Sequence, residues 1–280
     1  MLPLFAINAV LILGYAFLTL YPEFLARLAW APSLLAVSQP LLIRIQILVG
    51  FWFCMRACQK AMGFRWFLFL AVTVVVSLLT EFWGTIFGIP FGTYTYTRLL
   101  GWQIAGKVPM LIPISWFCLS VGSYVLAMQL LGPASMQIFT RTTNHWYRSA
   151  QRVGLAVCLL IAWGIMLEPM MARLTPYWVW QESPAHVFPA EVRNLMTWSL
   201  TGLFIFFGFE FLRLRDEVHR FERFWALKFY GISLSLPFGL AVVAGAWAPI
   251  ILSMALLLGC YMFSRKKGVI KRGRFGASSR

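Results

Sequence analysis

Apolar stretches of roughly 17 to 24 residues recur along this chain from one end to the other. A helix needs about 20 such residues to cross the hydrocarbon core of a bilayer, about 30 Å thick. With 60% hydrophobic and 12% charged residues, the chain has too little polar material to cover a soluble globule. We therefore predict an all-α, polytopic transmembrane helix bundle of about 8 spans. The spans are expected at 4–20, 41–57, 66–89, 110–132, 152–172, 195–212, 227–246 and 248–263.

Basic residues are distributed unevenly among the loops that join these stretches. The net charge is +15, and one set of alternate loops, with the C-terminal tail, holds 18 of the 24 Lys and Arg residues, while the opposite set holds 6. Cytoplasmic loops carry such an excess, so the N- and C-termini are both predicted to be cytoplasmic. The pattern is typical of a multi-pass protein of the cytoplasmic (inner) membrane whose basic side faces anionic lipids, with no nucleic acid as partner.

The chain is predicted to form a single transmembrane helical domain at 1–264, with the core site region at 66–212, and a basic cytoplasmic tail at 265–280. No basic residue precedes the first apolar stretch and no small-residue cleavage site follows it, so we interpret it as a span and not as a signal peptide. The five cysteines include no CxxC pair, which indicates packing roles and not a zinc site or a disulfide framework.

The sequence lacks the metal-binding and cofactor-binding residues that several classes of membrane enzyme need. The single aspartate, Asp216, argues against Asp-rich prenyltransferases, which hold a magnesium diphosphate. The three histidines, His145, His186 and His219, fall in different loops, whereas a di-iron site needs a cluster. Neither a P-loop nor a dinucleotide-binding G-x-G-x-x-G motif after a strand pattern is present. We therefore expect chemistry without metal, flavin, nicotinamide or nucleotide.

Three glutamates fall inside apolar stretches, where an ionised group costs about 2.5 to 3.5 kcal/mol. Glu210 lies near a predicted helix end with Arg213 three residues on, and an ion pair at the membrane interface explains it. Glu81 and Glu168 each lie about 15 residues into their helices, so their carboxyls are expected at one depth, in the outer half of the bilayer.

The surroundings of these two acids suggest a shared site. Gly84 and Gly88 are expected on the helical face of Glu81, where a neighbouring helix or a flat substrate could approach closely. Pro169 should end or kink the helix of Glu168. The outer loops that follow both acids are rich in Pro, Gly and aromatic residues, as in a weak parallel repeat. An apolar pocket with aromatic walls and two carboxyls suits proton-initiated chemistry on a hydrocarbon.

At these residues the chain resembles a known group, the integral-membrane carotenoid biosynthesis protein family, which includes the CruF-type carotenoid hydratases and the bisanhydrobacterioruberin hydratases. The likeness covers roughly 66–212 and rests on the glutamate, the spaced glycines and "PFGTYTY" at 90–96, with "PMLIPISWF" at 109–117 and "YWVW" at 177–180. It departs from the family where Glu168 replaces the usual aspartate before proline, and where Gly164 replaces an aspartate often found a few residues earlier.

The resemblance implies a cofactor-free hydratase, a hydro-lyase that adds water to the terminal double bond of a linear carotene end group through a carbocation. Such chemistry needs a carboxylic acid that keeps its proton near neutral pH, and burial away from water favours that form. We expect Glu81 to be the acid and Glu168 to orient the water, although the two roles could be exchanged. The substrate-binding residues are expected to be Gly84, Gly88, Pro90, Phe91, Tyr94, Tyr96, Trp116, Tyr177, Trp180, Asn194 and Trp198, among which Tyr94, Tyr96 and Trp116 or Trp198 would stabilise the cation.

Three other functions fit parts of this pattern. A transmembrane carotenoid cyclase would use the same protonation and yield a ring of unchanged mass. A proton-coupled transporter would use paired intramembrane acids, but the Pro and Gly interruptions lie at the outer rim and not at the midplane of paired spans. A non-catalytic membrane scaffold would bind other carotenoid-pathway enzymes through the basic loops, and alanine at Glu81 and Glu168 would leave the products unchanged.

Overall fold

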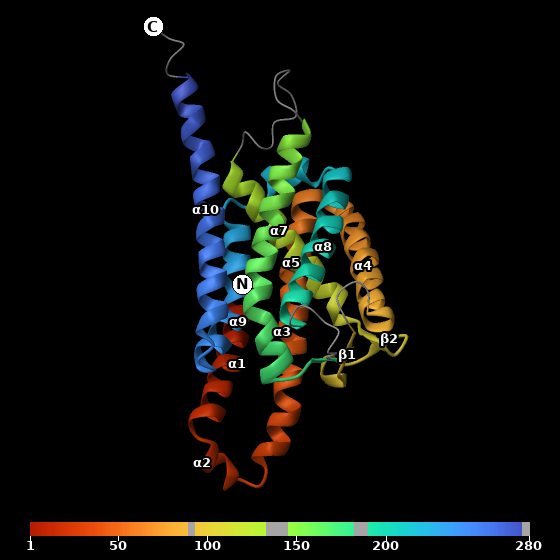
Figure 1. Ribbon diagram of the computed structural model, residues 1–280, viewed down its shortest axis with the longest axis vertical. Helices are drawn as coiled ribbons and strands as arrows, with labels where there is room; N and C mark the ends of the chain where they lie inside the picture. The colour runs from red at the N-terminus through yellow and green to blue at the C-terminus, as the bar shows by residue number, and fades with distance from the viewer. Residues whose placement is uncertain (89–92, 133–144, 182–189, 276–280) are drawn as a thin grey trace.

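The computed structural model describes residues 1–88, 93–132, 145–181 and 190–275, most of which are helical (Figure 1). The long helices are α1 (Leu2–Leu20), α3 (Ala31–Met62), α4 (Trp66–Phe82), α5 (Leu111–Leu131), α7 (His145–Pro169), α8 (Ala190–Phe211), α9 (Trp225–Val243) and α10 (Trp247–Phe275). The short elements are α2 (Pro22–Ala26), the 3-10 turns η1 (Gly63–Arg65), η3 (Arg98–Leu100) and η5 (Leu214–Arg220), and the π-helical turns η2 (Trp83–Phe87) and η4 (Met170–Leu174). The strands are β1 (Tyr94–Tyr96), β2 (Gln103–Ile104), β3 (Val108–Pro109) and β4 (Trp178–Trp180).

The eight predicted apolar stretches fall on the eight long helices, which confirms an all-α, polytopic bundle. Among the described residues, 6 helical stretches are long and apolar enough to cross a membrane, or up to 7 if the bent pair Val192–Phe211 and Leu214–Arg220 forms one span. One of these stretches, Ser33–Phe87, contains both α3 and α4, between which the chain turns at Gly63 with a φ of 57°. The cytoplasmic placement of both termini stays a prediction.

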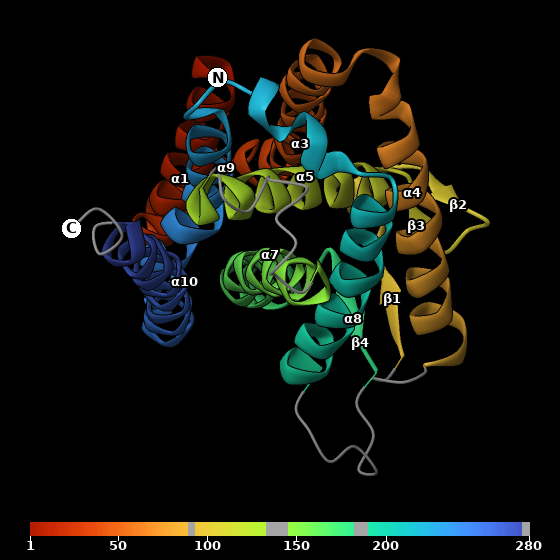
Figure 2. The same cartoon turned by 90° about the horizontal axis from the view of Figure 1, so that it is seen from above.

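Helix α5 forms the centre of the bundle. In the most apolar 18-residue segment of α5, 83% is buried inside the bundle, whereas in the corresponding segment of α1 only 17% is buried. It packs against α3, α4, α7 and α9, and Figure 2 shows it lying between α3 and α7. Helix α7 packs in turn on α8 and α10. Because α5 is apolar on all sides, it is stable only where other helices surround it.

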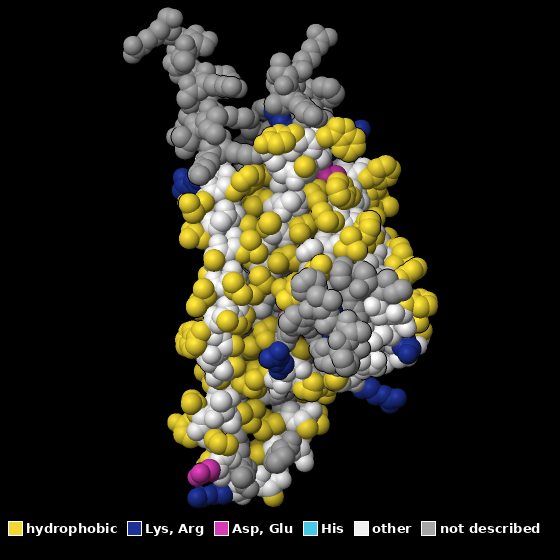
Figure 3. All heavy atoms as spheres, viewed as in Figure 1, with side chains coloured by type: hydrophobic (Ala, Val, Ile, Leu, Met, Phe, Trp, Pro, Cys, Tyr) yellow, Lys and Arg dark blue, Asp and Glu magenta, His cyan; other side chains and the backbone are white. Residues whose placement is uncertain are grey.

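The outer faces of the surrounding helices are apolar as well. Leu13 is 68% exposed, Val37 67% and Phe67 61%. Figure 3 shows hydrophobic side chains spread along the visible face, with few charged side chains among them. Water would disfavour so large an apolar surface, whereas lipid tails accept it. The protein is therefore a multi-pass membrane protein.

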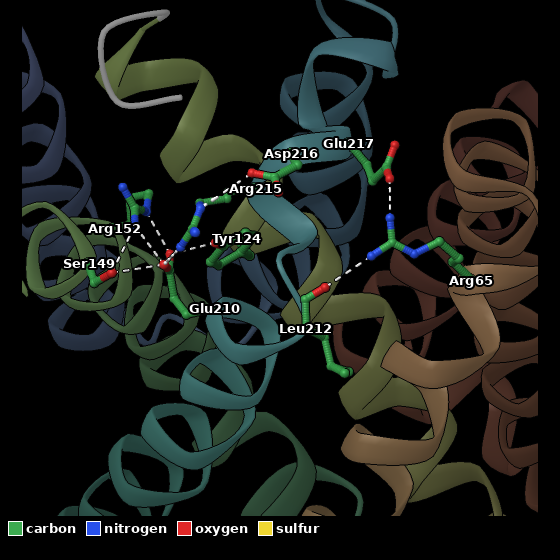
Figure 4. A network of polar contacts seen from close by, with 9 residues as sticks. All are labelled: Arg65, Tyr124, Ser149, Arg152, Glu210, Leu212, Arg215, Asp216 and Glu217. Atoms are coloured by element: carbon green, nitrogen blue, oxygen red, sulfur yellow. Dashed lines mark hydrogen bonds and ion pairs between the residues drawn. The ribbon is translucent and has the colours of Figure 1, made fainter. Parts of the chain in front are cut away.

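A buried ion cluster ties α5, α7 and α8 together at one end of the bundle (Figure 4). The Glu210 carboxylate accepts two hydrogen bonds of 2.6 Å from Arg152, through Nε and Nη2. It also accepts bonds from the hydroxyls of Tyr124 at 2.6 Å and Ser149 at 2.9 Å, and from Arg215 Nη1 at 3.0 Å. Arg152 is 3% exposed and Glu210 8%. Full pairing satisfies charges that would otherwise be costly to bury.

The ion pair predicted for Glu210 is thus present, but its predicted partner, Arg213, is wrong. Helix α8 ends at Phe211, and Arg213 has a φ of 60°, so its side chain does not continue the helical face of Glu210. Arg152 takes that place from a different helix. This cluster lies at the start of α7 and the end of α8, whereas Glu168 lies at the end of α7. The bundle therefore carries buried acids at both ends.

Candidate active site

Glu81 is held in the last turn of α4 by hydrogen bonds from three aromatic side chains. The Tyr94 and Tyr96 hydroxyls both donate to Oε2, the second at 2.7 Å, and Trp116 Nε1 donates to Oε1 at 3.1 Å. The tyrosines come from β1 and the tryptophan from α5. Glu81 is only 7% exposed. The carboxyl is thus buried but surrounded by donors that can stabilise a negative charge on it.

Glu168 occupies the matching position at the end of α7. Trp178 and Trp180 donate their indole N–H groups to Oε1 at 3.0 and 2.9 Å, and the Asn194 amide donates to Oε2. The next residue is Pro169, and the helix then widens into the π-helical turn η4. A π-helical turn likewise follows Glu81 almost directly, as η2. The two acids therefore share the same local chain geometry.

The strands β1 and β4 join the two acids into one site. They pair antiparallel, with Tyr94 opposite Trp180 and Tyr96 opposite Trp178. The ring centroids of these pairs are 4.9 Å and 6.2 Å apart. Side chains alternate along a strand, so all four rings lie on one face of the pair. That face supplies two donors to Glu81 and two to Glu168, which places both carboxyls against one aromatic cluster.

A cavity of about 60 Å³ lies beside this cluster. Glu81 contributes directly to its wall, as do Asn194 and Trp198 from α8. Glu168 contacts it through Trp178, Trp180 and Asn194, which line the wall themselves. The other lining residues are Tyr94, Tyr96, Ile112, Ser115, Trp116, Leu119, Trp163 and Leu167. The cavity is therefore aromatic and apolar, with one carboxyl that can reach a bound molecule.

Both tyrosines at Glu81 act as hydrogen-bond donors. Burial, and after it the neighbouring Glu81 carboxyl, raises the pKa of Tyr94 and of Tyr96 well above the usual tyrosine value. Both phenols therefore keep their protons at any physiological pH. Because a hydroxyl can rotate, each can also accept a bond when Glu81 carries a proton.

One polar atom in the cavity wall has no partner. Trp163 Nε1 is buried and makes no hydrogen bond within the described residues. Ser115 lines the same cavity, and its hydroxyl donates to the Ile112 carbonyl at 2.8 Å and keeps its lone pairs. A buried donor without an acceptor is costly, so a bound molecule with an oxygen atom would be stabilised at Trp163.

Glycines make room for the aromatic side chains. A Cβ on Gly84 would lie 2.8 Å from the Tyr94 ring, and one on Gly164 would lie 2.7 Å from the Trp198 ring. The predicted close approach at Gly84 is thus taken up by the protein's own tyrosine. Gly88 ends η2 with a φ of 64°, a left-handed conformation that favours glycine.

The remaining predicted site residues divide into three groups. Trp116, Trp180, Asn194 and Trp198 line the cavity together with both tyrosines. Pro90 and Phe91 lie outside the described residues. Tyr177 is 2% exposed and lines neighbouring cavities instead, because it immediately precedes Trp178 in the chain and its ring does not join the β4 face.

Sequence reasoning missed Trp178, Trp163 and Ser115 as site residues. The period-two alternation of a strand through "YWVW" would have grouped Trp178 with Trp180 and separated both from Tyr177. Nothing in the sequence distinguishes Trp163 from the other tryptophans of the apolar stretches. Among the described residues, no group of three or more His, Cys, Asp or Glu side chains lies together to hold a metal ion.

Known proteins similar to this chain point to one pathway. Residues 41–260 match the model of a family described as "Carotenoid biosynthesis protein". A curated relative from Haloarcula japonica, named bisanhydrobacterioruberin hydratase, is 27% identical over 195 residues. The match covers 63% of this chain, and the chain spans 60% of the length of that relative. No solved structure matches the chain.

Proposed function

The chain belongs to the carotenoid biosynthesis protein family, and on this basis we propose that it is a hydratase acting on the end group of a linear carotene. Water adds across the terminal double bond and leaves a tertiary alcohol. The observation that carries this proposal is the Glu81 carboxyl in the wall of an aromatic, apolar cavity. The name of the Haloarcula japonica relative supports the same reaction class.

Glu81 supplies the proton. In its neutral form Glu81 transfers the carboxyl proton to the carbon of the terminal double bond that already carries a hydrogen. The other, fully substituted carbon of that bond becomes a tertiary cation. The three donors from Tyr94, Tyr96 and Trp116 then stabilise the carboxylate that remains. These bonds are stronger to the carboxylate than to the acid, so they lower the barrier selectively.

The aromatic wall stabilises the cation. Trp198 lies with its ring centroid 5.0 Å from that of Trp116 and 5.9 Å from that of Trp163. Rings grouped in this way offer negative faces to a positive charge that forms among them. An apolar site also strengthens the attraction between the cation and the Glu81 carboxylate.

Water is held by the unpartnered Trp163 N–H and the Ser115 hydroxyl. The Trp163 group donates to the water oxygen, and the water donates one hydrogen to Ser115, which leaves a lone pair for the cation. Attack forms the C–O bond, and the extra proton passes to the Glu81 carboxylate, which restores the starting acid. Glu168, which the sequence led us to expect as the water-orienting group, is not among the described residues that line the cavity, and it acts instead through Trp178, Trp180 and Asn194, which it fixes in the cavity wall.

Replacing Trp163 by Phe should lower the hydration rate by about 3 to 10-fold, because one hydrogen bond to the water is lost. Turnover per folded molecule in purified, reconstituted protein measures this. Trp102→Phe is the matched control, since Trp102 is 71% exposed and lies outside the cavity lining. An unchanged rate in Trp163→Phe would remove Trp163 from the water site.

The function is tested by expressing the chain in a host that accumulates a linear carotene and analysing the pigments by mass spectrometry. We expect a product that has gained one water and carries a tertiary hydroxyl at a chain end. A cyclic product of unchanged mass would identify a cyclase instead. Pigments identical to those of the empty host would support a transporter or a scaffold.

A further inference from the structure

A second, larger cavity lies directly beside the Glu81 cavity. It measures about 100 Å³ and is lined mainly by residues of α1, α3, α5, α7 and α9. The two cavities share part of their walls, so their contents are near neighbours. The shared lining residues are Ile112, Ser115, Leu119, Trp163, Leu167 and Trp178.

The chemistry of this larger cavity suits part of a hydrocarbon chain. Among the residues that the structure describes, no charged side chain lines it, and its far wall includes Leu4, Ile47, Gly50, Phe229 and Leu236. An unfilled apolar space costs packing energy in a helix bundle. Ligand sites are concave, mostly apolar and largely formed in advance. These features favour an uncharged, apolar occupant.

We propose that this cavity, which we name the chain chamber, holds the part of the substrate's polyene chain next to the end group, while the end group itself lies beside Glu81. The inference rests on the hydratase function proposed above. This part of the carotene then passes Trp163 and Trp178, where the walls are shared, and lies within the bundle instead of in the surrounding lipid. This arrangement fixes the end group over the acid and keeps water away from the internal double bonds.

Gly50 offers a way to fill the chamber without touching the acid. It lines the chamber but not the Glu81 cavity, and a Cβ there would have Leu4 Cδ1, at 4.0 Å, as its nearest neighbour. A leucine side chain at this position would therefore extend into the chamber. Ser233, on α9, also lines the chamber, so a leucine there would fill it from another wall. Gly231, on the same helix and with nothing within 4 Å of its Cβ, is the matched control.

The test compares a long linear carotene with a short acyclic terpene that has the same end group. In Gly50→Leu and Ser233→Leu, hydration of the carotene should fall at least about tenfold, while hydration of the short terpene should stay within about twofold of wild type. Gly231→Leu should behave as wild type with both. A second readout is the visible absorption shift of the carotene on binding to purified protein, which both filled variants should lose.

Three results would overturn the chain chamber. The first is carotene binding and turnover that Gly50→Leu and Ser233→Leu leave unchanged. The second is an equal fall for the long and short substrates. The third is that the filled variants lose co-purified phospholipid but still bind carotene, which would assign the chamber to a lipid acyl chain. If wild type binds carotene but hydrates neither substrate, the proposed function fails, and loss of the absorption shift in the filled variants still supports the chamber.

Discussion

Glu81→Gln should lower turnover by about 10² to 10⁴-fold while the amount of folded protein stays close to wild type. Glutamine has the same size and polarity but no transferable proton. Its amide oxygen can still accept from Trp116, and the two tyrosine hydroxyls can rotate to accept from its NH₂ group. The cavity should therefore persist without its acid. Turnover per molecule of purified protein, with a linear carotene as substrate, measures the effect.

Variants at two other glutamates provide the comparison. Glu23→Gln changes an exposed glutamate of α2 and should leave turnover unchanged. Glu168→Gln keeps an acceptor for the two indole N–H groups and should retain more activity than Glu81→Gln. Glu168→Leu removes that acceptor and should lose more. If the acids only tie helices together, abundance and activity would fall in parallel, and near-normal turnover in Glu81→Gln would contradict the acid role.

Arg152→Met should destabilise the folded protein by about 3 to 5 kcal/mol, because Glu210 would lose its main buried partner. The two residues are 3% and 8% exposed, so water cannot replace the lost pairing. Arg215, which bonds Glu210 at 3.0 Å, remains and offsets part of the loss. Unfolding in detergent with increasing denaturant measures the change in free energy of unfolding.

An exposed ion pair provides the matched control for this change. Lys228 and Glu222 lie 3.1 Å apart with side chains 58% and 65% exposed, so Lys228→Met should cost no more than about 1 kcal/mol. Adding Glu210→Leu to Arg152→Met should recover part of the stability, since no uncompensated acid remains. Turnover per folded Arg152→Met molecule should stay normal, because this cluster lies at the other end of the helices from Glu168. Equal stability of the two methionine variants would contradict the buried-pair account.

The helices and the two acids could be predicted because they depend on local patterns. The length of an apolar stretch is enough to predict a membrane span, and a carboxyl within such a stretch is easily recognised because it is rare there. The proline after Glu168 also indicated the end or a kink of its helix. These signals need no knowledge of which segments meet in space.

The partners of the acids could be predicted only in part. Pairing of β1 with β4 joins segments more than eighty residues apart, and no local pattern in the sequence indicates that they meet. Tyr177 was therefore grouped with Trp180, although it lines the chain chamber and not the Glu81 cavity. Arg152 was missed because its pairing with Glu210 depends on how α7 packs against α8. The chain chamber depends on the packing of five helices, which no single stretch encodes.

The most direct measurement follows the isotopes of water into the product. Purified protein is given a linear carotene in water labelled with heavy oxygen, and separately in heavy water, and the product is analysed by mass spectrometry. Protonation by Glu81 followed by attack of water predicts one heavy oxygen in the hydroxyl group and one deuterium bound to the adjacent carbon. A product whose oxygen comes from dissolved O₂, or which carries deuterium without heavy oxygen, would contradict hydration at this site.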